Sequence, residues 1–77
     1  MGRQKKLDDA EILKAIALSP DPVVTAPELA GQIEEYGEDG VRHRLKELRD
    51  RGLVNSRDVG ARATVWWITP DGRAAIR

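Results

Sequence analysis

Apolar residues recur at helical spacing near the start of the chain. Ile12, Leu13 and Ile16 fall on one face of a helix, so the pattern predicts a helix over residues 8–18. Two prolines follow within residues 19–22, and proline cannot continue the hydrogen-bond ladder of a helix. The first helix is therefore expected to end there.

A short second helix is predicted after the prolines. Thr25 and Glu28 have the spacing of a capping box, in which each side chain accepts a hydrogen bond from a free backbone amide. Pro27 falls in the first turn, where its missing amide costs little. The second helix is expected to run from Ala26 to about Glu34.

The third predicted helix is the longest and follows a glycine-containing turn. Val41, Leu45 and Leu48 are spaced i, i+4 and i+7, which predicts a helix over residues 39–51. Gly52 comes next, and glycine commonly ends helices because it adopts the left-handed conformation without a steric cost.

The chain then changes to a strand pattern. Two strands are predicted over residues 53–57 and 63–69, joined by a glycine-containing loop. Trp66 and Trp67 are neighbours on the second strand, so their rings must project to opposite faces. Only one of the two rings can belong to the core. Residues 70–77 leave room for at most one or two turns of helix.

The order of these elements is typical of a helix-turn-helix followed by a wing. Three helices precede a two-stranded hairpin, so the predicted fold class is α+β, mainly α, with a winged helix-turn-helix architecture. The winged domain would span residues 8–77, preceded by a basic N-terminal arm at residues 1–7. A chain of 77 residues can build one small core.

Three stretches of the sequence carry a family resemblance. They are PVVTAPELA at residues 22–30, VRHRLKELRDRGLV at residues 41–54 and VGARATVWWITPDG at residues 59–72. Together they resemble the archaeal winged helix-turn-helix transcription-regulator family, particularly its small haloarchaeal members. The second stretch is widespread among winged helices, whereas the tryptophan-containing stretch is more particular to this family. The family pattern implies that Trp66 and Ile68 face the core and that Trp67 faces outward.

The resemblance implies sequence-specific binding of double-stranded DNA by a small transcriptional regulator, more specifically a repressor. The helix over residues 39–51 would enter the major groove, and the wing, residues 57–63, would lie on the backbone or in the minor groove. Arg44 and Arg51 would meet phosphate or solvent. The expected DNA contacts are Glu38, Asp39, Arg42, His43, Lys46, Arg49, Arg57 and Arg62.

The formal net charge is zero, but the charges are segregated along the chain. Residues 1–7 carry a net charge of +3, residues 8–40 carry −8 and residues 41–77 carry +5. Such asymmetry between halves indicates a nucleic-acid partner. Two ordinary solvated faces would produce the same segregation.

Composition argues against several other functions. The chain has no cysteine and one histidine, so it lacks a thiolate metal site and the partners of a nucleophilic triad, and we expect neither an enzyme nor a cofactor. No apolar stretch approaches the ~20 residues that cross a bilayer, so we expect no membrane contact and a cytoplasmic, nucleoid-associated location.

Other interpretations stay open from the sequence. The acidic face and Trp67 could bind another protein without any DNA readout. A tryptophan in the wing also resembles the winged helices that bind left-handed DNA, but the Asn and Tyr that those proteins carry on the third helix are missing here. Arg57 and Arg62 could protect hairpin edges, and His43 could face solvent. A homodimer through residues 8–18 or the Trp67 face is a further expectation.

Overall fold

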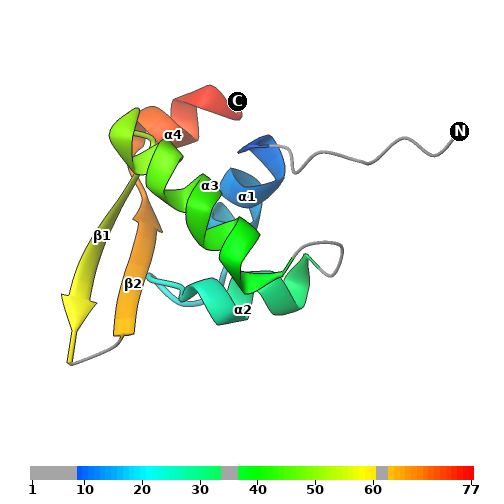
Figure 1. Ribbon diagram of the computed structural model, residues 1–77. Helices are drawn as coiled ribbons and strands as arrows, with labels where there is room; N and C mark the ends of the chain where they lie inside the picture. Colours follow the sequence, from blue (N-terminus) through cyan, green and yellow to red (C-terminus); the bar gives the residue numbers. More distant parts are fainter. Residues whose placement is uncertain (1–8, 34–36, 61–62) are drawn as a thin grey trace, which may run out of the picture.

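The computed structural model describes residues 9–33, 37–60 and 63–77, and it has the predicted winged helix-turn-helix architecture. The hairpin extends to one side of the helices, with α3 lying in front of α1 (Figure 1). The elements are α1 (Asp9–Ala17), α2 (Ala26–Gln32), α3 (Glu38–Asp50), β1 (Val54–Val59), β2 (Ala63–Ile68) and α4 (Pro70–Ala75).

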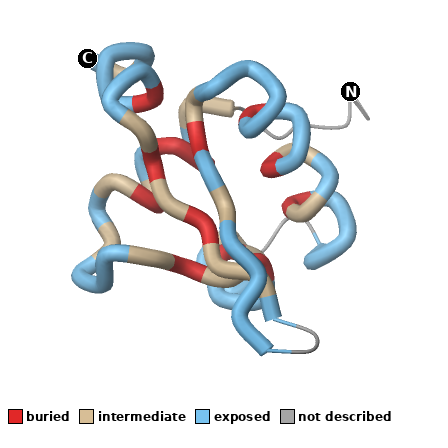
Figure 2. Tube along the Cα trace, turned by 90° about the vertical axis from the view of Figure 1, so that its left-hand side faces the viewer, coloured by how far each residue is buried: buried red, intermediate tan, exposed pale blue. Residues whose placement is uncertain are grey.

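One apolar core joins these elements. Every residue predicted to face inward on the first and third helices is buried, and the burial alternates along the chain as the helical and strand periods require (Figure 2). Within the described residues, no polar or charged residue is buried. The buried side chains are Ile12, Leu13, Ile16, Val24, Ala26, Leu29, Val41, Leu45, Leu48, Val54, Trp66 and Ile68.

The ends of α2 and α3 follow from their caps. The predicted capping box is confirmed: the Thr25 amide donates to Glu28 Oε1 at 2.9 Å, and the Glu28 amide donates to Thr25 Oγ1 at 3.3 Å. Helix α2 ends at Gln32, two residues before the predicted end, and Glu34 lies outside the described residues. Gly52 follows α3 with a φ of 78°, as its left-handed role requires.

The two strands form an antiparallel hairpin that is one layer of the fold. Strand β1 extends to Val59, beyond the predicted end at residue 57, because Asp58 pairs with Thr64 and accepts a hydrogen bond from its hydroxyl at 3.0 Å. Val24 forms an isolated antiparallel bridge with β2, because it exchanges two backbone hydrogen bonds with Trp66, at 2.8 and 2.9 Å.

The tryptophan pair divides as the strand geometry predicts. Trp66 is 3% exposed and faces the helices, so its predicted core position is confirmed. Trp67 is directed to the opposite face of the strand, as expected, and its ring is partly buried. It lies against the segment that follows α1, whose approach no local pattern could reveal.

Helix α4 packs closely on the turn after α3. Thr69 caps it, because Thr69 Oγ1 accepts from the Gly72 amide at 3.0 Å and donates to the Gly52 carbonyl at 2.6 Å. Gly72 is buried, and a Cβ added there would lie 2.1 Å from the carbonyl oxygen of Leu53. No side chain fits at that position without a shift of the backbone.

The close approach at Gly72 gives a stability test with a matched control. Gly72→Ala is expected to lower the free energy of unfolding by about 1–3 kcal/mol, because the added methyl group overlaps Leu53. Gly40→Ala in α3 is expected to raise it by about 0.5 kcal/mol, since Gly40 has open space around it and alanine loses less backbone entropy. Urea unfolding followed by circular dichroism measures both, and effects of the same sign would contradict this packing.

Candidate nucleic-acid interface

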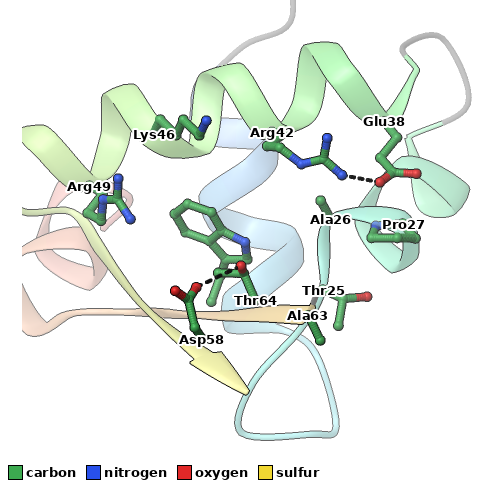
Figure 3. Close-up of a pocket in the computed structure, with 11 residues that line it drawn as sticks. Thr25, Ala26, Pro27, Glu38, Arg42, Lys46, Arg49, Asp58, Ala63 and Thr64 are labelled. Carbon is green, nitrogen blue, oxygen red and sulfur yellow. Dashed lines mark hydrogen bonds and ion pairs between the residues drawn. The ribbon is translucent and has the colours of Figure 1, made fainter. Parts of the chain in front are cut away.

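A groove of about 570 Å³ opens between α3 and the hairpin. Helix α3 forms one wall, the hairpin forms the other, and the start of α2 closes one end (Figure 3). The lining residues are Thr25, Ala26, Pro27, Glu38, Arg42, Lys46, Arg49, Asp58, Ala63, Thr64 and Trp66.

Three bases of α3 share the groove wall. Arg42, Lys46 and Arg49 are spaced i, i+4 and i+7, so they lie on one side of the helix, next to the buried stripe (Figure 3). Glu38 lines the same wall, so the structure brings together four of the predicted contact residues on one side of α3.

Arg42 is already engaged in the free protein. It forms an ion pair with Glu38 one turn earlier, and its Nη1 lies 3.5 Å from Asp39 Oδ1. Both acids belong to the predicted contact set, and they come from the first turn of α3, where negative charge suits the helix dipole. The positive charge of Arg42 is thus largely balanced at the surface that would meet DNA.

Arg49 holds the hairpin against α3. Its Nη1 donates to Ser56 Oγ on β1 at 2.7 Å, and its guanidinium carbon lies 5.4 Å from the centroid of the Trp66 ring. That distance is typical of a cation–π contact. Arg49 therefore has a structural role that its helical spacing does not reveal.

Among the described residues that line the groove, Lys46 is the available cation. Its side chain is exposed, and among the described residues it has neither a hydrogen bond nor an ion pair. Its ammonium group is consequently free to meet an anion. Lys46 lies between the engaged Arg42 and Arg49, near the middle of the groove.

Of the two wing arginines predicted to contact DNA, Arg57 lies within the described residues. Arg57 pairs with Val65 in the ladder, whereas Asp58 and Thr64 belong to the groove wall, so strand alternation puts Arg57 on the opposite face of the hairpin. Arg62 lies outside the described residues. DNA contact by either arginine stays a prediction.

The remaining side of α3 is tied to α1. Arg44 pairs with Asp9 of α1 and donates to Glu47 Oε1 at 2.7 Å, while Arg51 donates to Asp9 Oδ2 at 2.9 Å. Hydrogen bonding to Asp9 raises the pKa of Arg44. His43 also lies near this network, with Nε2 3.4 Å from Glu47 Oε2.

The pairing of Arg44 and Arg51 with Asp9 was not predicted, although Arg51 stays exposed to solvent as expected. Asp9 is 35 residues from Arg44 in the sequence, so helical periodicity could not reveal the pairing. The positions of Asp58 and Thr64 in the groove wall were not predicted from the sequence either. Strand alternation could have found them, because both share the Trp66 face.

Residues 9–33, 37–60 and 63–77 contain neither of two other features that would point to a function. No three His, Cys, Asp or Glu side chains are grouped so that they could hold a metal ion. No helix in these ranges is long and apolar enough to cross a membrane.

Solved structures of MarR-family regulators resemble this chain, although no protein-family model and no curated protein matches it. One is a MarR family transcription regulator, with 30% identity over 88% of this chain and 44% of its own, and a TM-score of 0.75. Another is the zinc-responsive MarR family member ZitR of Lactococcus lactis, with 22% identity over 97% of this chain and 52% of its own, and a TM-score of 0.73. This chain spans about half the length of each, and the shared fold is the winged helix.

The different states of Arg49 and Lys46 give a second stability test. Arg49→Ala is expected to lower the free energy of unfolding by about 1 kcal/mol, because it removes the Ser56 hydrogen bond and the contact with Trp66. Lys46→Ala, on the same wall, should change it by less than about 0.5 kcal/mol. Thermal unfolding measures both, and equal losses would contradict the structural role of Arg49.

Proposed function

We propose that this chain is the DNA-binding winged-helix domain of a transcription regulator, with the groove between α3 and the hairpin as its contact surface. The observation that carries the proposal is that Lys46, on a groove wall with Arg42 and Arg49, has no partner in the part of the chain that the structure describes. The fold shared with MarR-family transcription regulators supports it. Double-stranded DNA is the partner whose phosphates suit such a wall.

The proposed contacts divide into two kinds. Lys46 meets a backbone phosphate as a mobile point charge, whereas Arg42 can grip the O6 and N7 atoms of guanine in the major groove. Glu38 and Asp39 can accept a hydrogen bond from cytosine N4. His43 lies farther round α3, and Arg57 and Arg62 would add contacts from the wing.

Finer properties of the proposal rest on the sequence resemblance. The regulator would act as a repressor by occupying a promoter. It would be of the same kind as the small archaeal winged helix-turn-helix regulators. Its place of action would be the DNA of the nucleoid, in the cytoplasm.

The phosphate contact of Lys46 is tested by a salt titration on random-sequence duplex. Log affinity should fall linearly with log salt, and Lys46→Ala should reduce the magnitude of that slope by about one. Lys14→Ala removes an equal charge from the exposed side of α1 and should leave the slope unchanged. Absence of duplex binding at low salt would refute the proposed function.

The balance of charge around Arg42 gives a further expectation. Glu38→Gln removes the carboxylate that pairs with Arg42 and with it a negative charge that would repel phosphates, so affinity for random duplex should rise by about threefold. Glu11→Gln on α1 is the control, because it changes the net charge equally at an exposed position outside the groove. Fluorescence anisotropy measures both, and a weaker Glu38→Gln complex would contradict this role.

A further inference from the structure

Two charged side chains at the start of α3 form a joined pair in the groove wall. Glu38 and Arg42 are one helical turn apart, both line the groove, and an ion pair joins Arg42 Nη2 to Glu38 Oε2 (Figure 3). Each side chain is 43% exposed, so a ligand in the groove can reach both. The pair therefore presents hydrogen-bond donors beside an acceptor at the end of the groove that the start of α2 closes.

The charge of this pair suits the edge of a base pair better than it suits a phosphate. The charges of Glu38 and Arg42 cancel, and the carboxylate of Asp39 lies 3.5 Å from Arg42 Nη1. A phosphate is attracted by net positive charge, which this end of α3 lacks. The edge of a base pair carries no net charge and presents its own donors beside acceptors.

The ion pair leaves hydrogen-bonding capacity on both side chains. The guanidinium group of Arg42 carries several N–H donors in a planar fork, and its bond to Glu38 is made through Nη2. Glu38 accepts that bond with Oε2, and within the described chain Glu38 Oε1 accepts no other. The pair can therefore donate to one base and accept from another while its two members stay together.

A G·C base pair presents the complementary pattern in the major groove. Guanine offers the acceptors N7 and O6, and cytosine offers the donor N4 beside them. Arg42 can donate to the guanine while Glu38 accepts from the cytosine of the same base pair. An A·T pair places the adenine N6 donor against Arg42, and the thymine O4 acceptor and methyl group against Glu38, so its pattern does not match.

We propose that Glu38 and Arg42 together read one G·C base pair, which makes Glu38 a specificity-determining residue of the groove. This inference rests on the proposed function, because it names the sequence element that the same groove recognises. At any other base pair Arg42 loses its guanine contact and the Glu38 carboxylate gains no hydrogen bond to offset its repulsion of the phosphates. Glu38 therefore weakens binding to random DNA more than it weakens binding to a matched site.

Selection of bound duplexes from a random library, followed by fluorescence anisotropy on single duplexes, tests this inference. Sites enriched by the wild-type protein should share an invariant G·C pair, and replacing it with A·T should weaken binding about tenfold. Glu38→Gln should reduce this ratio to about threefold or less, because the glutamine amide both donates and accepts and so also accommodates adenine. Glu11→Gln makes an equal charge change outside the groove and should leave the ratio unchanged.

The position of the lost preference shows whether the two side chains act together. Glu38→Gln and Arg42→Ala should relax the preference at the same base pair, and circular dichroism checks that both variants are folded. Relaxation at two different positions, a ratio that Glu38→Gln leaves unchanged, or enriched sites without an invariant G·C pair would overturn the inference alone, since DNA is bound in each case. Absence of duplex binding by the wild-type protein would overturn the proposed function as well.

Discussion

The contact of Trp66 with the helices fixes the position of the hairpin, and both faces of the sheet depend on it. Its ring is buried, its backbone exchanges two hydrogen bonds with Val24, and Arg49 of α3 lies over its ring. The groove exists because this contact holds the hairpin beside α3. Since successive strand residues alternate, the same contact directs Trp67 to the opposite face, where a second hollow forms.

The basic residues of α3 and of its C-terminal end differ in the partners that they contact, which the zero net charge does not show. Five Lys and Arg residues lie between positions 41 and 51, and within the described chain four of them have acidic, hydroxyl or aromatic partners. Arg44 and Arg51 hold α1 against α3 through Asp9, and Arg49 holds the hairpin. Charge segregation along the sequence therefore overstates the positive charge available to a ligand, and of these five bases Lys46 is the one without a partner among the described residues.

Local patterns predict most of the fold because the elements are stabilised by features close together in the sequence. The capping box of Thr25 and Glu28, the inward stripe of α3 and the turn at Gly52 all depend on spacings of seven residues or fewer. The site depends on longer distances. The pairing of Asp9 with Arg44, the contact of Arg49 with Trp66 and the approach of Trp67 to the end of α1 bring together residues that no period connects.

The most direct test of the central claim is an amide chemical-shift titration of the isotope-labelled protein with a short DNA duplex at low salt. The proposed surface predicts that the largest shifts fall on α3 around Arg42 and Lys46, on Thr64 and on the start of α2. The resonances of amides around Leu18 and Trp67 should shift little. Shifts concentrated around Leu18 and Trp67, or no shifts at all, would contradict binding of DNA through the groove.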